Sequence, residues 1–283
     1  MKTILLPYHD EEAARSALST AILVAKRFDS YLEGLLVMGA PHIALSFGPG
    51  MPVPPEYLSL AAQEWRRFAD GARKDFLKIT GNGGLPFREL ESAAEGAAAG
   101  WREIEGRESE VIGAYGRLFD LIVIGRTKAG AAARWRESCE TALFESGRPV
   151  LLASADAPKT IGKVVVVAWN GSTESARTIA FGMPLLLGAE RVEVLSVQGH
   201  MVPGPSGAEM SSHLLRHGIS ANSRTLVADQ RPAGEVILDE AGDLGADLVL
   251  KGAFTRSRFR QVVFGGTTQH ILDFAMVPVL LAH

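Results

Sequence analysis

The sequence contains two copies of one pattern, and this repeat restricts the possible folds more than any other feature. Four pairs of segments match in the same order along the chain. They are residues 4–7 and 165–168, 35–39 and 195–199, 120–125 and 247–252, and 149–153 and 278–282. The last pair is identical, since both segments read Pro-Val-Leu-Leu-Ala. Four matches in one order indicate an internal duplication, so we expect two related domains in tandem.

The two copies differ in length in one region. Gly39 and Gly199 are 160 residues apart, whereas Gly125 and Gly252 are 127 residues apart. The first copy therefore carries 33 additional residues between its second and fourth strands. The insertion includes a loop rich in Pro and Gly at residues 47–55 and a polar helical stretch at residues 63–78.

Each copy alternates short apolar strands with longer amphipathic helices. In the second copy we expect strands at residues 164–168, 192–197, 224–228, 248–251 and 279–282, and helices at residues 173–187, 209–217, 234–244 and 267–274. Continuous Val, Leu and Ile strands that alternate with helices are typical of a parallel sheet covered on both faces. The predicted fold class is α/β, with two doubly wound, mainly parallel five-stranded sheets and helices on both faces. We place the domains at residues 1–155 and 160–283, on either side of the polar linker Ser154–Lys159.

The composition argues against several classes of protein. The formal net charge is -3, whereas nucleic-acid binding rests on clustered Lys and Arg, so we expect no nucleic-acid partner. The single cysteine, Cys139, excludes an internal disulfide and suits a reducing compartment. The apolar run at residues 3–6 is too short for a signal peptide, and no stretch approaches the roughly 18 apolar residues of a membrane span. We therefore expect a cytoplasmic protein with no membrane contact.

A group of small and hydroxyl-bearing residues in the second copy indicates a phosphate site. Ligands of doubly wound sheets bind beyond the carboxyl ends of the strands. Gly265 and Gly266 lack a Cβ, so their backbone N–H groups can approach an anion closely. Thr267 and Thr268 follow at an expected helix N-terminus, where free N–H groups and the helix dipole favour negative charge. Gly252, directly after a strand, would let a ligand lie over the backbone. The alternative interpretation of Gly265-Gly266-Thr267 is a simple turn in which Thr is the N-cap of the following helix.

These residues resemble the signature of the universal stress protein family. That signature is Gly, two residues, Gly, nine residues, Gly, and then Ser or Thr, and here Gly252 precedes Gly265-Gly266-Thr267-Thr268. The segment Ala168–Arg177 is similar to the first turn of the family, usually Asp-Gly-Ser, and the resemblance extends over both copies. The sequence departs from the family at Asn170, where Asp is usual, at Thr255 in place of the second Gly, and at Gly266 in place of the hydroxyl residue.

The resemblance implies a fold, a ligand and a set of binding residues. The implied fold is that of the adenine nucleotide α-hydrolases, with the last strands, residues 150–153 and 279–282, paired across a two-fold as a pseudo-dimer. In the family, the first turn and the end of strand two enclose adenine and ribose, and the Gly-rich loop holds the phosphates. The residues implicated in binding ATP or ADP, with or without Mg, are Ala168, Trp169, Asn170, Val197, Gly252, Gly265, Gly266, Thr267 and Thr268.

The first copy departs much further from this pattern. Residues 7–11, Pro-Tyr-His-Asp-Glu, replace the first turn, and Gly125-Arg126-Thr127-Lys128 keeps only the first Gly. Ser138 and Cys139 stand where the phosphate-binding Gly and hydroxyl residue are expected, and Glu140 adds a charge that repels phosphate. We therefore expect a degenerate site in the first copy and one nucleotide per chain.

Other constellations give little indication of chemistry. No Gly-x-x-x-x-Gly-Lys-Ser/Thr motif is present, which disfavours a P-loop ATPase. His213 and His217 are four residues apart but have no further ligand at metal-site spacing, so we assign no metal site. Arg256, Arg258 and Arg260 either flank a triphosphate or form a solvated loop.

The function that follows is a stress-response regulatory protein that binds ATP or ADP in its C-terminal domain. No residue is placed as a general base, so we expect no catalytic residue and at most slow hydrolysis. The sequence does not identify the protein partner and leaves open a further homodimer of whole chains. One alternative is a nucleotide-free interaction module in which both sites have decayed. Another is an adenylating enzyme on the same fold, which usually carries acceptor-substrate motifs that are not found here.

Overall fold

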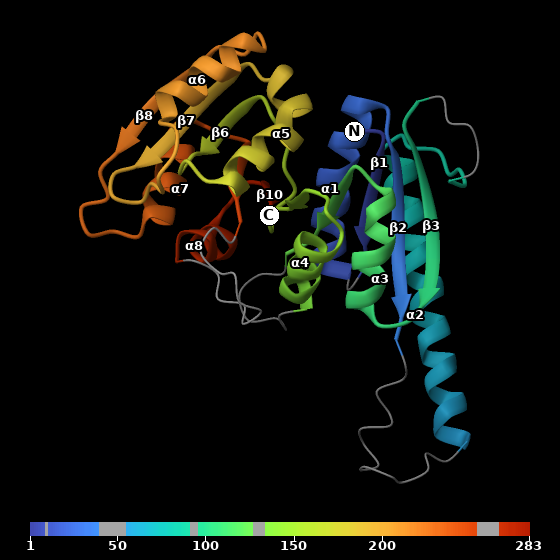
Figure 1. Ribbon diagram of the computed structural model, residues 1–283. Helices are drawn as coiled ribbons and strands as arrows, with labels where there is room; N and C mark the ends of the chain where they lie inside the picture. Colours follow the sequence, from blue (N-terminus) through green and yellow to red (C-terminus); the bar gives the residue numbers. More distant parts are fainter. Residues whose placement is uncertain (9–10, 40–54, 91–95, 127–133, 254–265) are drawn as a thin grey trace.

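The computed structural model describes residues 1–8, 11–39, 55–90, 96–126, 134–253 and 266–283 (Figure 1). The strands of the first half are β1 (Thr3–Pro7), β2 (Tyr31–Met38), β3 (Ala98–Glu105), β4 (Leu121–Ile124) and β5 (Val150–Leu152). Its helices are α1 (Glu11–Phe28), α2 (Pro55–Asn82), α3 (Glu108–Tyr115) and α4 (Arg134–Glu145), with a short 3-10 helix at Gly116–Leu118.

The second half repeats this order of elements. Its strands are β6 (Val164–Ala168), β7 (Arg191–Val197), β8 (Ala221–Leu226), β9 (Leu248–Gly252) and β10 (Val279–Ala282). Its helices are α5 (Thr173–Leu187), α6 (Gly207–Arg216), α7 (Ala233–Asp243) and α8 (Gly266–Phe274).

All ten strands join one sheet in the order β3-β2-β1-β4-β5-β10-β9-β6-β7-β8. Neighbouring strands within each half are parallel, and both halves have their first strand between their second and fourth. The halves meet at an antiparallel pair in which Leu280 lies opposite Leu151. The predicted fold class and the pairing of the two last strands are confirmed. The pairing gives each strand a neighbour on the side that would otherwise be an exposed sheet edge.

The backbone repeats in detail, which is consistent with the expected tandem of related domains. The residue after β1 donates from its backbone N–H to β2, as Tyr8 N lies 2.8 Å from Leu35 O. The residue after β6 does the same, because Trp169 N lies 2.8 Å from Leu195 O. Both first strands therefore end at the same place relative to their neighbours.

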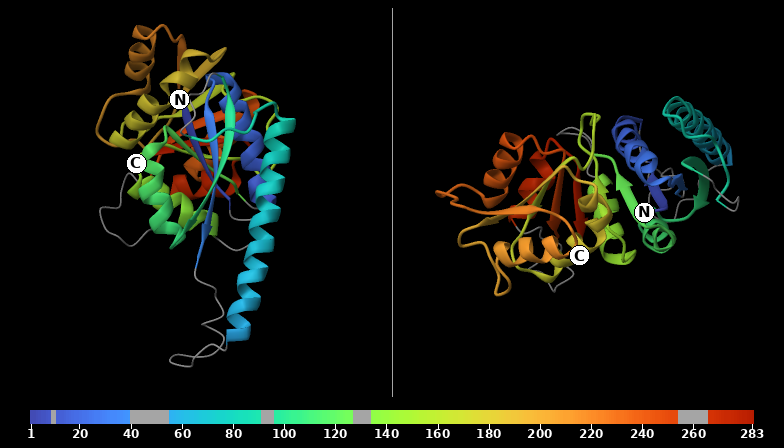
Figure 2. Two further views of the ribbon diagram at one scale, coloured as in Figure 1. Left: turned by 90° about the vertical axis from the view of Figure 1, so that its right-hand side faces the viewer. Right: turned by 90° about the horizontal axis from the view of Figure 1, so that it is seen from above.

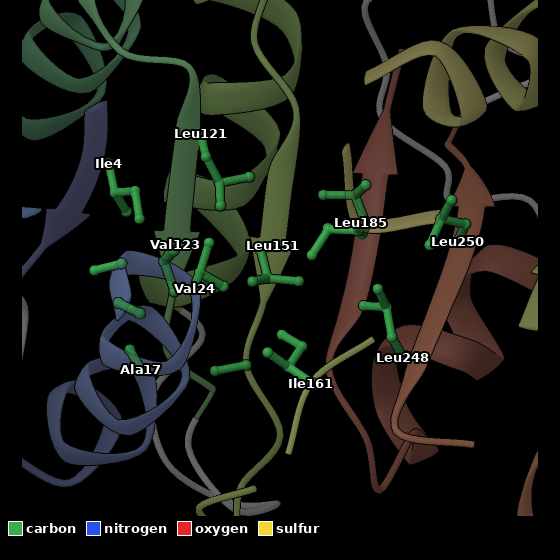
Figure 3. Close-up of a cluster of buried hydrophobic side chains, with 14 of the residues drawn as sticks. Ile4, Ala17, Val24, Leu121, Val123, Leu151, Ile161, Leu185, Leu248 and Leu250 are labelled. Carbon is green, nitrogen blue, oxygen red and sulfur yellow. The ribbon is translucent and has the colours of Figure 1, made fainter. Parts of the chain in front are cut away.

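Two apolar clusters hold the helices against the sheet, one on each face. Helices α1, α2, α5 and α6 cover one face, and α3, α4, α7 and α8 cover the other. Each cluster includes buried residues from both halves, and Figure 3 shows Leu121 and Leu151 on one side of the junction with Leu185 and Leu250 on the other. Because burial of apolar surface is the main favourable term in folding, the junction is part of the core of the protein.

The inserted segment of the first half forms a long helix. Helix α2 has 28 residues, whereas α6, at the same place in the second half, has 10. Figure 2 shows that the N-terminal part of α2 runs past the end of the sheet. The expected helix at residues 63–78 is thus part of α2, and most of the expected loop at residues 47–55 lies outside the described residues.

The expected strand at residues 224–228 is wrong at both ends. Strand β8 begins at Ala221 and ends at Leu226. It lies at the edge of the sheet, and its central side chains are exposed. These residues are polar, so a search for apolar runs does not identify them as a strand. Val227 belongs to the expected range but lies outside β8, and it is 62% exposed.

Candidate functional site

A cavity of about 700 Å³ lies at the carboxyl ends of the strands of the second half. Strands β6 and β9 are neighbours here, but the chain continues from β6 to β7 on one side and from β9 to β10 on the other side. This switch point is where doubly wound sheets bind their ligands. The cavity is lined by Asn170, Gly199, His200, Val202, Pro232, Ala233, Lys251, Gly266, Thr267, Thr268, Gln269, His270, Asp273 and Phe274.

The turn after β6 holds Asn170 at the cavity wall. The Asn170 Oδ1 accepts a hydrogen bond from the Ser175 hydroxyl at 2.5 Å and from the Ser172 backbone N–H at 3.3 Å. Ser172 is the N-cap of α5, since its Oγ accepts from the Ser175 N–H at 3.2 Å. Gly171 between them has a φ of 82°, a conformation that favours glycine. The Asn oxygen is therefore committed to fixing the turn and the start of α5.

Three of the expected ligand-binding residues are buried and do not line the cavity. Ala168 and Val197 are buried at the ends of β6 and β7. Trp169 is 3% exposed, and its indole Nε1 donates to the Pro205 carbonyl at 2.9 Å. The tryptophan thus anchors the loop that follows β7. None of these three side chains is among the described residues that line the cavity.

Gly252 has a structural role that the sequence did not reveal. A Cβ at this position would lie 2.4 Å from the backbone N of Ser175, so the glycine allows α5 to pack closely on the end of β9. Gly125 has the same role in the first half, where a Cβ would lie 2.1 Å from the Ala13 carbonyl oxygen in α1. A glycine at the end of the fourth strand is therefore required by helix packing in both halves.

The first turn of α8 forms another wall of the cavity. Gly266, Thr267 and Thr268 are its first residues, and a Cβ at Gly266 would meet no atom of the described residues within 4 Å. The first N–H groups of a helix have no partner within the helix, so this wall presents hydrogen-bond donors and the positive end of a dipole. Gly265 and the three arginines Arg256, Arg258 and Arg260 lie outside the described residues.

Lys251 is a cavity residue that the sequence reasoning missed. Its side chain is buried, with 5% of the residue exposed, and its Nζ donates to the Gly252 carbonyl at 2.5 Å. Burial lowers the pKa of Lys251 to about 8, against a smaller opposing effect of the Glu174 carboxylate. The signal was present in the repeat, because the matching residue of the first half is the apolar Ile124. His200, His270 and Asp273 also line the cavity and were not expected there.

The corresponding residues of the first half are arranged differently. Ser138 and Cys139 are buried inside α4, whose described part begins at Arg134. The Ser138 hydroxyl donates to Glu108 at 2.7 Å, and burial raises the pKa of the Cys139 thiol to about 12. Ser138 and Cys139 thus belong to the protein core, unlike Gly266 and Thr267 at the start of α8.

The first half nevertheless contacts the helix that forms the cavity wall. The Arg126 guanidinium donates to the carbonyls of Leu272, at 2.8 Å, and Ala275, at the C-terminal end of α8. Arg136 forms an ion pair with Asp273 of the same helix. Cations at a helix C-terminus interact favourably with the dipole, so these two residues of the first half stabilise α8.

His213 and His217 lie side by side at the C-terminal end of α6. The rings of His213 and His217 lie with centroids 4.9 Å apart. Within the described ranges, no three His, Cys, Asp or Glu side chains are grouped so that they could bind a metal ion. Of the helices in this part of the chain, none has the length and apolar character needed to cross a bilayer.

The fold and the cavity define a doubly wound α/β protein with a cavity at its switch point, and comparisons with known proteins support one family. Residues 162–283 match the sequence profile of the Universal stress protein family. A universal stress protein from Archaeoglobus fulgidus DSM 4304 shares the fold with a TM-score of 0.70 at 16% identity, covering 99% of this chain and 97% of that chain. A protein of unknown function from Pseudomonas aeruginosa PAO1 does so with a TM-score of 0.54 at 16% identity, covering 100% and 92%. None of the curated proteins compared with the chain matches it.

Proposed function

We propose that this protein is a tandem universal stress protein that acts in a stress response by binding ATP or ADP in its C-terminal half. The observation that carries the proposal is the cavity at the switch point, which brings Asn170 together with the first turn of α8. Its volume of about 700 Å³ lies within the range of small-molecule sites. The family profile over residues 162–283 covers the same half.

The walls of the cavity suggest how the ligand lies. The phosphates belong at the start of α8, where Gly266 leaves space and Thr267 and Thr268 add hydroxyl groups. Adenine and ribose belong near Asn170 and the ends of β6 and β7. Ala168, Trp169 and Val197 remain predicted contacts of this part of the ligand, although they are buried and do not line the cavity. Gly252 supports the site by letting α5 approach, and Gly265 remains a predicted phosphate ligand.

The proposal divides the chain into two domains with different roles. Residues 160–283 bind the nucleotide, with or without Mg, and residues 1–155 hold none. The burial of Ser138 and Cys139 within α4 supports this division. We assign no catalytic residue, expect at most slow hydrolysis, and place the protein in the cytoplasm in keeping with its single cysteine.

The test is titration calorimetry with ATP and ADP, together with mass spectrometry of the native protein purified without added nucleotide. Gly266→Val should weaken binding about tenfold or more, because losing one hydrogen bond to a charged group costs about 1.5–3 kcal/mol. Gly242→Val is the matched control, since a Cβ there also meets no atom of the described part of the chain within 4 Å, and Gly242 lies in α7 and does not line this cavity. If the wild-type protein retains no nucleotide and binds none, the proposal is wrong and a nucleotide-free interaction module becomes the better interpretation.

A further inference from the structure

Lys251 is a buried cation at a position where the repeat has an apolar side chain. In the register of the sheet, Leu121 lies beside Ile4 and Leu248 lies beside Val165, so Ile124 and Lys251 occupy equivalent places. Ile124 is completely buried in the apolar cluster of its face. An aliphatic side chain can therefore pack at this position, and the fold does not require a lysine there.

The protein compensates this charge only in part. An ammonium group has three N–H donors, and in the part of the chain described here the Gly252 carbonyl accepts one of them. The described carboxylates form no ion pair with Lys251, although Glu174 is near enough to favour its charged form. Desolvation of a charge without a close counterion is strongly unfavourable. A buried charge of this kind that lines a cavity is a candidate functional residue.

The side chain lies on the face of the sheet that α8 covers. Side chains alternate along a strand, and Val249, two residues before Lys251, belongs to the cluster under α7 and α8. Lys251 lines the same cavity as Gly266, Thr267 and Thr268. Lys251 and the first turn of α8 thus line one space, together with His200 and His270. The acidic residue of the wall, Asp273, is paired with Arg136.

We infer that the ammonium of Lys251 is the charged contact for the phosphate groups of the ligand, so that this cavity selects polyphosphate esters over uncharged nucleosides. The inference rests on the proposed function, because it concerns the same cavity. The bound phosphate would supply the counterion that Lys251 lacks in the described part of the protein. The cost of burying the lysine would then be offset when an anion binds.

The test compares ATP, adenosine and inorganic tripolyphosphate as ligands of the wild-type protein and of Lys251→Met, by titration calorimetry at neutral pH. The wild type should bind ATP at least ten times more tightly than adenosine. Lys251→Met should lose at least tenfold in affinity for ATP and for tripolyphosphate, with little change for adenosine. Lys163→Met is the control, since Lys163 lies at the opposite end of β6 and pairs with Glu190 at the surface. Lys251→Ile, the residue of the first half, is a second variant in case the first folds poorly.

Failure of the inference and failure of the proposed function give different results. Equal affinity of the wild type for ATP and adenosine, or wild-type ATP affinity in Lys251→Met, would overturn the role of Lys251 and leave adenine binding intact. Binding of tripolyphosphate that depends on Lys251, without binding of ATP, ADP or adenosine, would support the lysine and overturn the adenine nucleotide. Binding of none of the probes would overturn both.

Discussion

Replacing Lys251 by methionine should stabilise the ligand-free protein, although the same change should weaken phosphate binding. The ammonium is buried at the end of β9, and its pKa is lowered from 10.5 to about 8 because burial disfavours the charged form. At neutral pH the folded protein therefore carries a charge that would be more stable in water. Methionine has a similar length and no charge, so it removes the penalty and keeps most of the packing.

The size and the sign of the effect follow from the two pKa values. One pKa unit corresponds to about 1.36 kcal/mol, so a drop from 10.5 to about 8 corresponds to about 3 kcal/mol of destabilisation. Below pH 8 the lysine is protonated in both the folded and the unfolded protein, and the full penalty applies. Between about pH 8 and 10.5 the unfolded chain binds more protons, so the stability contributed by this group rises with pH. The advantage of Lys251→Met should be greatest below pH 8 and should disappear towards pH 10.5.

The assay is urea unfolding of the wild type, Lys251→Met and Lys163→Met at pH 7 and at pH 10, without nucleotide. Other groups that titrate in this range are common to the proteins, so the difference between variant and wild type isolates Lys251. We expect Lys251→Met to gain up to about 3 kcal/mol at pH 7 and much less at pH 10, with little change in Lys163→Met. A loss of stability at pH 7, or a gain that does not vary with pH, would refute the reasoning.

Two further predictions concern the glycine after β9 and the number of ligands. Gly252→Ala should lower the free energy of unfolding by about 1–3 kcal/mol, because its Cβ would lie 2.4 Å from the Ser175 backbone. Gly266→Ala should have little effect on stability, and equal denaturation midpoints for the two variants would contradict the prediction. Equilibrium dialysis should give close to one nucleotide per chain, since Ser138 and Cys139 are buried within α4. A value near two would show that the first half also binds.

The buried strands could be predicted from the sequence because continuous apolar runs carry a strong local signal, whereas the pairing of the two halves followed from the family resemblance. The strands Val164–Ala168 and Val279–Ala282 are continuous apolar runs, and both have the expected bounds. Strand β8 was misplaced because it lies at the edge of the sheet, where polar side chains are tolerated and the apolar pattern disappears. The error thus reflects the weak constraint on exposed positions.

Local sequence motifs selected Asn170 and the first turn of α8, and these two segments line one cavity. The positions of Gly252 and Lys251 in the site depend on tertiary packing, which local motifs do not show. Gly252 was interpreted as making room for a ligand, but the group that approaches it is the N-terminus of α5. Lys251 was not singled out, because a sequence does not show directly that a lysine is buried among elements distant in the chain. The indication of burial in the sequence was the apolar residue Ile124 at the matching position of the first half.

The second half depends on the first for two features of its site, whether or not the first half binds a ligand. Strand β5 pairs with β10 and thereby covers an edge of the sheet that carries the cavity. Arg126 donates to the last carbonyls of α8, and Arg136 pairs with Asp273 on the same helix. Helix α8 has 9 residues, and so short a helix is marginal without tertiary support. The first turn of α8 is thus held at the cavity partly by contacts at its other end, which gives a physical reason for the two halves to share one chain.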